Sequence, residues 1–366
     1  MVSFKILAGG YTSFVATYLF NTDTNSLSVY SRSTTGTNPS WISAHPKNSS
    51  ILYAVNEVGP TGALQSFTIS QSGTLSSAVE TITSSGSNPA YVVPLSSGEV
   101  AIMNYSSGNG RIIPTTSSPQ RFNSSAGVLS FAQTGRDASH PHMALEYNGE
   151  ILVPDLGGDT IWRLVQNGSP GQFRIQGSIP QPYGSGPRHI AIYNERLFTI
   201  HELSSTLSVQ TIPAAPNGTS TVISTVSIIP TDAGTPPSGS TTWAAAEILI
   251  PSPSSRFPTP YIYVSNRNVG YNLDPRGDSI AIFEHVNVGT SSESLRLVNQ
   301  VFTGLSQIRG MQFGPADSRG GDEFLIAAGV AGTAGTVVLR RTEGGRNLQV
   351  VARNLDIPTR TSFVWL

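Results

Sequence analysis

Short apolar runs of five to eight residues recur along the whole chain, separated by clusters of Gly, Pro, Asn and Ser. Val, Ile, Tyr, Phe and Thr dominate these runs, which is typical of β-strands bounded by turns. No segment shows the three- and four-residue apolar spacing that an amphipathic helix requires. The pattern therefore predicts an all-β protein.

The predicted strands group in fours, named A to D here in chain order. In the clearest unit they cover His189–Tyr193, Arg196–His201, Thr206–Ile212 and Thr221–Ile229. The preceding unit is predicted at His142–Tyr147, Ile151–Asp155, Thr160–Val165 and Gln172–Ile179. The following unit is predicted at Ala244–Ile250, Tyr261–Ser265, Ser279–Glu284 and Leu295–Phe302.

A polar residue near the end of strand B marks the period. Successive markers are 48, 51, 46 and 65 residues apart: Asn56, Asn104, Asp155, His201 and Asn266. A period near fifty residues with four strands per unit is typical of β-propellers. Six complete units fit between about Asn38 and Asp356.

The remaining strands predict how the ring closes. They are one strand at the C-terminus and three at the N-terminus: Ser362–Leu366, Phe4–Ala8, Phe14–Asn21 and Leu27–Ser31. One plus three makes a seventh blade and leaves no open sheet edge. We expect one seven-bladed β-propeller domain over residues 1–366, with four antiparallel strands per blade and the last blade closed by the C-terminal strand plus three N-terminal strands.

Composition excludes several classes of protein. The net charge is −1 without a basic patch, so nucleic-acid binding has no electrostatic support. No run of 18 apolar residues exists, so we expect no membrane span. The chain has no cysteine, which excludes disulfides, thiolate zinc sites and a cysteine nucleophile. We expect a monomer.

Two surface features favour secretion slightly over a cytoplasmic location. All but two of the 21 basic residues are arginines. Five Asn-X-Ser/Thr sequons occur, at Asn48, Asn104, Asn123, Asn167 and Asn217. The chain is predicted to be folded strand from Phe4 onward, so a secreted form would have lost its signal peptide.

Propeller geometry predicts where polar side chains converge. Strand A is innermost and strand B runs antiparallel to it, so the start of A and the end of B lie on one face. Those positions supply a set rich in charge and imidazole: His140, His142, Arg188, His189, Arg309, Glu57, Asp155, His201, Glu202, Asn266 and Arg267. Because charged residues make up only 12% of the chain, this concentration predicts a site at one mouth of the channel.

Some polar residues at or near these strand ends are predicted to have structural roles. Asp155 and Asp159 belong to an Asp-Leu-Gly-Gly-Asp turn with side-chain to backbone bonds. Glu247, inside a predicted A strand, is equally suited to bracing a neighbouring arginine. His140 and His142 lack further ligands at metal-binding spacing, so we expect no metal and no cofactor. There is no Gly-X-Ser-X-Gly motif.

Several motifs together resemble those of the seven-bladed lactonase family, which includes bacterial propeller 6-phosphogluconolactonases and the fungal carboxy-cis,cis-muconate lactonising enzyme. They are Ser139-His140-Pro141-His142, Asp155-Leu156-Gly157-Gly158-Asp159, Gly184-Ser185-Gly186-Pro187-Arg188-His189, Ala246-Glu247-Ile248, and Ser265-Asn266-Arg267 followed by Asp278-Ser279-Ile280-Ala281-Ile282-Phe283. The resemblance covers essentially the whole chain. It implies functional roles for His142, Arg188, Glu202 and Arg267, which the strand-end analysis selects independently.

The resemblance implies hydrolysis of a sugar-derived or related hydroxy-acid lactone. Lactone opening needs a base for water and a donor for the developing oxyanion. Glu202 or His142 is the candidate base, while Arg188 and Arg267 are candidates to bind the carbonyl oxygen and a substrate anion. Where bacterial members resemble Asn-Glu-Leu, this chain has His201-Glu202-Leu203, which leaves the acid–base assignment open.

Two alternatives remain at this stage. One is the reverse chemistry, a cycloisomerase that forms a lactone from a muconate-type acid. The other is a non-catalytic propeller that binds proteins or glycans. The substrate in either enzymatic case is a small lactone or carboxylic acid.

The remaining candidates surround these four residues. We expect substrate contacts from His140, His189, His201, Asn266, Glu57, Arg309, Tyr271 and Arg276. Tyr271 and Arg276 belong to the long segment Asn268–Asp278, which with Thr231–Thr242 is predicted to roof the site near the fifth unit.

Overall fold

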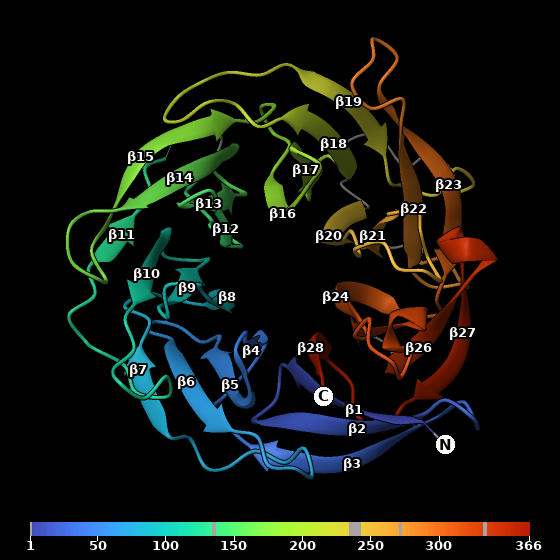
Figure 1. Ribbon diagram of the computed structural model, residues 1–366, viewed down its shortest axis with the longest axis horizontal. Coiled ribbons are helices and arrows are strands. Elements are labelled where there is room, and N and C mark those ends of the chain that lie inside the picture. The colour runs from blue at the N-terminus through green and yellow to red at the C-terminus, as the bar shows by residue number, and fades with distance from the viewer. Residues whose placement is uncertain (1, 134–136, 234–242, 271–272, 332–334) are drawn as a thin grey trace.

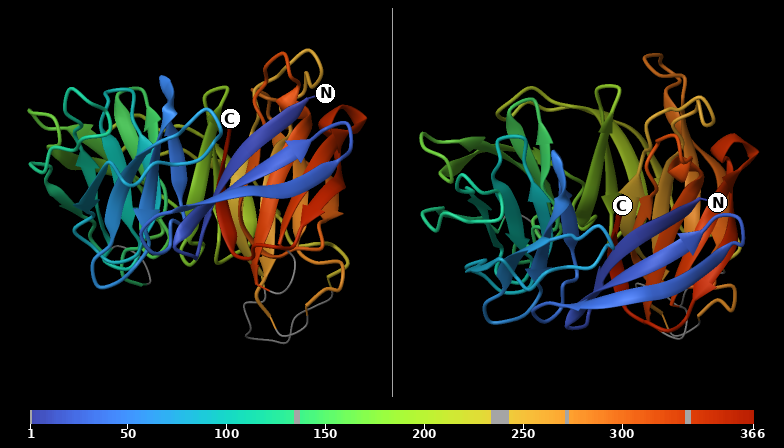
Figure 2. Two further views of the ribbon diagram at one scale, coloured as in Figure 1. Left: turned by 90° about the horizontal axis from the view of Figure 1, so that it is seen from below. Right: turned by 60° about the horizontal axis from the view of Figure 1, so that its bottom comes forward.

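The chain forms seven four-stranded antiparallel sheets arranged in a ring around a central channel (Figure 1). The computed structural model describes residues 2–133, 137–233, 243–270, 273–331 and 335–366. Seen from the side, the ring is a short disc with the strands running between its two faces (Figure 2). This confirms the predicted seven-bladed propeller with four strands per blade.

The blades follow the chain order. Blade 1 contains β4 (Ile42–His45), β5 (Asn48–Asn56), β6 (Ala63–Thr68) and β7 (Glu80–Thr83). Blade 2 contains β8 (Pro89–Pro94), β9 (Val100–Asn104), β10 (Asn109–Ile113) and β11 (Val128–Ser130). Blade 3 contains β12 (Leu145–Tyr147), β13 (Glu150–Asp155), β14 (Thr160–Gln166) and β15 (Phe173–Pro180). Blade 4 contains β16 (Pro187–Tyr193), β17 (Arg196–His201), β18 (Thr206–Thr211) and β19 (Val222–Ser227).

The remaining three blades complete the ring. Blade 5 contains β20 (Trp243–Leu249), β21 (Ile262–Asn268), β22 (Ser279–Val286) and β23 (Ser294–Phe302). Blade 6 contains β24 (Ser306–Phe313), β25 (Phe324–Ala331), β26 (Thr336–Thr342) and β27 (Asn347–Asn354). Blade 7 contains β28 (Arg360–Trp365), β1 (Ser3–Gly10), β2 (Phe14–Asn21) and β3 (Ser26–Thr34). Single-turn 3₁₀ helices lie at Gly321–Glu323 and Glu343–Gly345.

Blade 7 closes the ring by pairing the two ends of the chain, as predicted. The C-terminal strand β28 is innermost and pairs antiparallel with β1, with Ile6 opposite Trp365 and Ala8 opposite Phe363. Both termini lie at this blade (Figure 1). The closure satisfies strand edges that an open sheet would expose to other chains.

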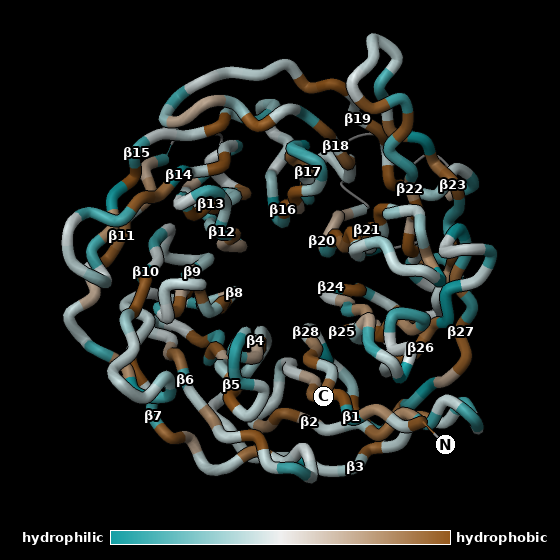
Figure 3. Tube along the Cα trace, in the orientation of Figure 1, coloured by the Kyte–Doolittle hydropathy of each residue, from teal (hydrophilic) through white to brown (hydrophobic). Residues whose placement is uncertain are grey.

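The core consists of seven clusters of buried apolar residues in the described part of the chain, one between each pair of neighbouring blades. Alternation along each strand supplies both sides. Ile6 of β1 packs toward blade 6, while the next residue, Leu7, packs toward blade 1. Figure 3 shows the resulting mixture of hydrophobic and hydrophilic positions in every blade. None of the described helices is long and apolar enough to cross a membrane.

Strand polarity brings the start of each innermost strand opposite the end of its neighbour. In blade 4, Pro187 at the start of β16 faces His201 at the end of β17. Most predicted strand boundaries shift by one to three residues, and the start of β12 moves from His142 to Leu145. In the segment before it, Pro141 forms an isolated bridge to Asp155 that is one residue out of register with the pairing of Leu145 and Leu152.

Candidate active site

A cavity of about 340 Å³ lies in the channel where strand ends from six blades meet. Its lining is mostly polar and aromatic: Tyr11, Ser40, Trp41, Glu57, Asn88, Ala90, Tyr105, Ser106, His142, Arg188, Glu202, Arg309 and Thr361. This volume is within the range of small-molecule sites. Five residues of the predicted set line this cavity: Glu57, His142, Arg188, Glu202 and Arg309.

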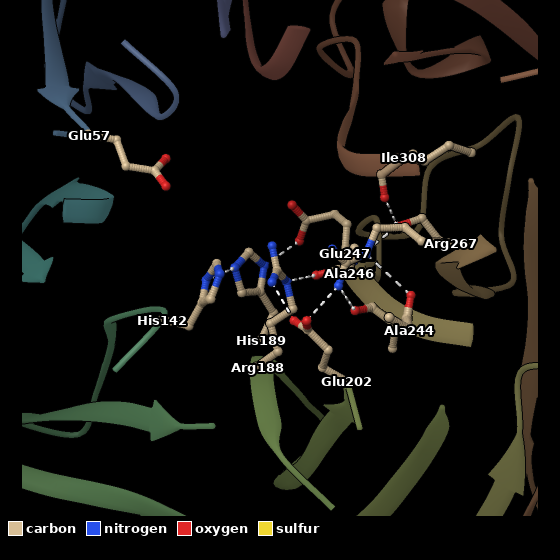
Figure 4. A network of polar contacts seen from close by, with 12 residues as sticks. Glu57, His142, Arg188, His189, Glu202, Ala244, Ala246, Glu247, Arg267 and Ile308 are labelled. Carbon is tan, nitrogen blue, oxygen red and sulfur yellow. Dashed lines mark hydrogen bonds and ion pairs between the residues drawn. The ribbon is translucent and has the colours of Figure 1, made fainter. Parts of the chain in front are cut away.

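Glu202 also lines this cavity and bridges two arginines from neighbouring blades (Figure 4). Its Oε2 pairs with Nη1 of Arg188, and its Oε1 lies 2.8 Å from Nη2 of Arg267. Burial alone would raise the pKa of Glu202, but the two guanidinium groups outweigh it and lower that pKa to about 2. Glu202 is therefore an anion across the working pH range.

Backbone carbonyls of β20 hold the two arginines in place. Arg188 Nε donates to the carbonyl oxygen of Ala246 at 3.0 Å. Arg267 Nε and Nη2 donate to the carbonyl oxygens of Ala244 and Ala245 at 3.3 and 3.1 Å. Arg267 lies behind Glu202 and is not among the residues lining the cavity. Of these two arginines, Arg188 alone faces the cavity.

His142 is the only described imidazole lining the cavity. Its backbone N–H donates to the carbonyl oxygen of Pro154 at 3.0 Å, which fixes the segment before β12. Burial, Arg188 and His189 lower the pKa of His142 well below its ordinary value. His142 is therefore neutral at neutral pH and able to accept a proton.

A buried chain of polar contacts continues from His142 away from the cavity (Figure 4). Its Nδ1 lies 3.2 Å from Nε2 of His189, whose Nδ1 lies 2.9 Å from Oε1 of Glu247. Glu247 thus pairs with an imidazole rather than with an arginine. His189 itself packs against the rings of Trp41 and Tyr91 and does not line the cavity.

Arg309 and Glu57 complete the charged lining. Arg309 has no ion-pair partner among the described residues, and its guanidinium carbon lies 5.8 Å from the centre of the Tyr11 ring. The Tyr11 hydroxyl donates to Oε1 of Glu57 at 3.5 Å. Burial raises the pKa of Glu57 although Arg309 and Arg188 oppose that shift. Glu57 projects from blade 1 toward the others across the channel (Figure 4).

The remaining predicted residues lie elsewhere. His140 stacks on Tyr105, with ring centres 4.4 Å apart, and its Nδ1 bonds to the Tyr105 carbonyl. His201 bonds to Gln181 and Thr206 between blades 3 and 4. Asn266 donates to the carbonyl oxygen of Ile228. These three residues shape or brace the wall without lining the cavity.

The predicted roof falls partly outside the described residues, and Tyr271 lies wholly outside them. Arg276 is about half exposed and pairs with Asp232 at 2.6 Å and Asp274 at 2.7 Å. Its guanidinium carbon lies 3.7 Å from the centre of the Phe302 ring. These partners engage Arg276 away from the cavity lining.

Asp155 is structural, as its turn motif predicts. It accepts from the Ser139 hydroxyl, the His140 and Gly158 backbone N–H groups and Nε1 of Trp162. No group of three or more His, Cys, Asp and Glu side chains in the described ranges has an arrangement suited to holding a metal ion.

The uncharged residues of the lining were not predicted from the sequence. Ser40 and Trp41 precede β4, Asn88 precedes β8, and Tyr11 and Tyr105 follow β1 and β9. All five occupy the start of an A strand or the end of a B strand. The same positional rule includes all five, but the set predicted from the sequence consists mainly of charged and imidazole side chains.

Known proteins agree with this architecture. Residues 5–365 match the family model described as "Lactonase, 7-bladed beta-propeller". A relative from Arthroderma benhamiae named "Probable 6-phosphogluconolactonase" is 25% identical over 326 residues, covering 84% of this chain and 76% of the relative.

Solved structures share the fold. A Lactobacillus plantarum protein superposes with a TM-score of 0.82 and 21% identity, covering 100% of both chains. The Pseudomonas aeruginosa periplasmic gluconolactonase PpgL superposes with a TM-score of 0.80 and 19% identity, covering 100% of this chain and 99% of the other. The match over nearly its full length shows that the chain belongs to the seven-bladed β-propeller lactonase family, and it is a lactone hydrolase.

Proposed function

We propose that the protein hydrolyses a sugar-derived lactone carrying an anionic group, and that the reaction takes place in the 340 Å³ cavity of the channel. One observation carries this proposal. The neutral imidazole of His142 lines the same cavity as Arg309, a cation without an ion-pair partner among the described residues. The base can activate water, and the unpaired guanidinium can bind the anionic group of such a lactone.

His142 is the base in this proposal. It accepts a proton from water as the water oxygen bonds to the lactone carbonyl carbon. The same proton then passes to the ring oxygen as the carbon–oxygen bond of the ring breaks. Glu202 is unsuited to this role, because a carboxylate with a pKa of about 2 has little tendency to take a proton from water.

The two cavity-lining arginines take different parts. Arg188, fixed by Glu202 and the Ala246 carbonyl, is suited to stabilise the oxyanion, because a preorganised donor costs no reorganisation when charge develops. Arg309 binds the phosphate or carboxylate of the substrate. Trp41 and Tyr105 offer ring faces to a sugar, while Ser40, Asn88 and Ser106 supply partners for its hydroxyl groups.

The charge states disfavour the cycloisomerase alternative. Forming a lactone from a muconate-type acid requires an acid that protonates the carbon framework. Glu202 is held ionised by two arginines, and burial keeps His142 unprotonated.

A substrate panel tests the proposal. Purified protein is assayed by pH-stat titration with a neutral aldonolactone, the same lactone carrying a terminal phosphate, and a muconate-type acid followed by its absorbance. We expect opening of the phosphorylated lactone with kcat/KM at least about tenfold above that of the neutral one, since a charged hydrogen bond contributes about 1.5–3 kcal/mol. Opening of neither lactone above its spontaneous rate would refute the proposal, and consumption of the muconate instead would establish the alternative.

A further inference from the structure

Three buried ionisable groups from three blades form one hydrogen-bonded chain that begins at the cavity (Figure 4). His142, His189 and Glu247 are 5%, 1% and 6% exposed. Burying a carboxylate and two imidazoles costs free energy that apolar packing between the blades would not cost. A buried polar cluster that lowers stability beside a site is a candidate for a functional role.

The hydrogen-bond pattern fixes where the protons lie when Glu247 is ionised and both imidazoles are neutral. Its Oε1 can only accept, so His189 carries its proton on Nδ1. The Nε2 of His189 then has a lone pair and must accept from Nδ1–H of His142. This leaves the lone pair of His142 on Nε2, the nitrogen not used in the chain. The chain therefore selects the tautomer in which His142 can act as a base toward the cavity.

The surroundings of His142 make a proton on it costly. Arg188, Arg309 and His189 all act on this imidazole and disfavour its charged form. An imidazolium there would be a further cation beside two guanidinium groups. A proton that is passed on through His189 instead reaches the carboxylate of Glu247. Glu247 also acts electrostatically on the neighbouring Tyr91. Moving the charge outward along the chain thus removes the repulsion.

We propose that His189 and Glu247 form a proton store for His142, holding the proton taken from water until the leaving oxygen needs it. This inference rests on the proposed hydrolysis. As water attacks, Nε2 of His142 gains a proton, Nδ1–H of His142 passes to Nε2 of His189, and Nδ1–H of His189 passes to Glu247. As the ring bond breaks, the three transfers reverse and Nε2 of His142 protonates the departing oxygen. Each cycle returns the chain to its starting state.

Glu247 also borders a second cavity, which leaves space beside its carboxylate when the charge of that carboxylate changes. This cavity, of about 540 Å³, is lined by Glu247 together with Trp41, Tyr91 and Met143. His142 lines the site cavity and Glu247 lines the second cavity, so His189 connects residues of the two cavities. His189 and Glu247 do not line the site cavity, so they act on the reaction only through His142.

Kinetics of two variants test the store. Glu247→Gln removes the charge, whereas His189→Gln retains an amide able to accept from His142 Nδ1–H but unable to pass a proton on. We expect both to lower kcat for lactone opening by about tenfold to hundredfold with KM within about threefold, because they impair acid–base transfer and not binding. Tyr91→Phe is the matched control, since it contacts the His189 ring from outside the chain and should leave kcat unchanged.

The outcomes separate storage from positioning. If either glutamine variant keeps the wild-type kcat, the proton store is wrong. If all variants fold with wild-type melting temperatures and both glutamine variants lose kcat, it is supported.

A second measurement does not depend on activity. Nitrogen-15 NMR of the histidine rings in the wild-type protein at neutral pH reports which ring nitrogen carries the proton. We expect Nδ1–H on both His142 and His189, with signals assigned by their loss in His142→Gln and His189→Gln. A proton on Nε2 of His142 would overturn the inference. Because this readout requires no substrate, failure of the proposed lactone chemistry remains distinguishable from failure of the chain.

Discussion

At the scale of single residues, the partner of each arginine decides what it can do. Arg188 and Arg267 share the single carboxylate of Glu202, which compensates one of their two positive charges. Arg309 lines the same cavity with no such partner among the described residues. The sequence positions of these three arginines do not distinguish their roles, because each lies at the start of an A strand or the end of a B strand.

The free guanidinium leads to a prediction about substrate charge. Arg309→Met should raise KM for a phosphorylated lactone by about tenfold or more, because a hydrogen bond to a charged group contributes about 1.5–3 kcal/mol. KM for the neutral lactone should change by less than about threefold. Steady-state kinetics on both lactones measures this, with Arg174→Gln, an exposed arginine of β15, as the control. An equal effect on both lactones would show that Arg309 does not recognise the anion.

At the scale of elements, β-bulges aim the site residues. In β16 the pairing with β17 skips from Pro187 to His189, which leaves Arg188 outside the regular register. Likewise Arg309 is skipped in β24, and Ala246 and Glu247 are skipped in β20. A bulge redirects a side chain that strict alternation would turn elsewhere. Neighbouring Arg188 and His189 can therefore both serve the site, one at the cavity and one behind it.

These bulges could not be predicted from the sequence. Alternating apolar residues predicted the strands, but alternation carries no signal for an unpaired residue at a strand start. The contact of Glu247 with His189 depends on such a bulge, and the pattern of residues therefore could not show that the two meet. The predicted start of β12 was wrong for a related reason, since the bridge between Pro141 and Asp155 is one residue out of register with the pairing of Leu145 and Leu152.

His201 joins blades 3 and 4, and it predicts a pH dependence of stability. Its Nε2 bonds to Gln181 and its Nδ1 to Thr206, and burial lowers its pKa to about 4 from an ordinary value of 6.5. The unfolded chain therefore binds a proton near pH 6.5, while the folded protein resists it until about pH 4. Its contribution to stability is complete above pH 6.5 and is lost as the pH falls toward 4.

Urea unfolding at pH 7 and pH 4 measures this effect. Between these values the free energy of unfolding of the wild type should fall by about 3 kcal/mol more than that of His201→Gln, which cannot take up the proton. The difference between the two proteins isolates His201 from the other titrating groups. Equal losses in both proteins would show that His201 is not held neutral by its burial.

At the scale of the whole molecule, the ring is predictable from the number and spacing of the strands along the chain. A period near fifty residues and a remainder of one plus three strands predicted both the blade number and the closure. Local patterns sufficed, because each blade is a continuous segment that contacts its two neighbours in order. The predicted convergence of strand ends also holds, since the cavity is lined by A-strand starts and B-strand ends.

The site as a whole was only partly predictable. The rule of strand ends found Glu57, His142, Arg188, Glu202 and Arg309 in the lining, but it also selected His140, His201 and Asn266, which lie outside it. Which of the residues near one face line the hollow depends on how seven blades pack around it. That packing is a property of the closed ring and not of any single unit.

The account depends most on His142 acting as the base in the channel cavity. The most direct measurement is kcat for opening of the phosphorylated lactone by wild type and His142→Gln between pH 4 and pH 8, corrected for spontaneous hydrolysis. We expect His142→Gln to lose about hundredfold or more in kcat with KM within about threefold. Because the pKa of His142 is lowered, the wild-type rate should stay constant as pH falls through 6.5 and decline only below it. A variant that keeps more than about a third of the wild-type kcat, or a wild-type decline centred at or above pH 6.5, would contradict the account.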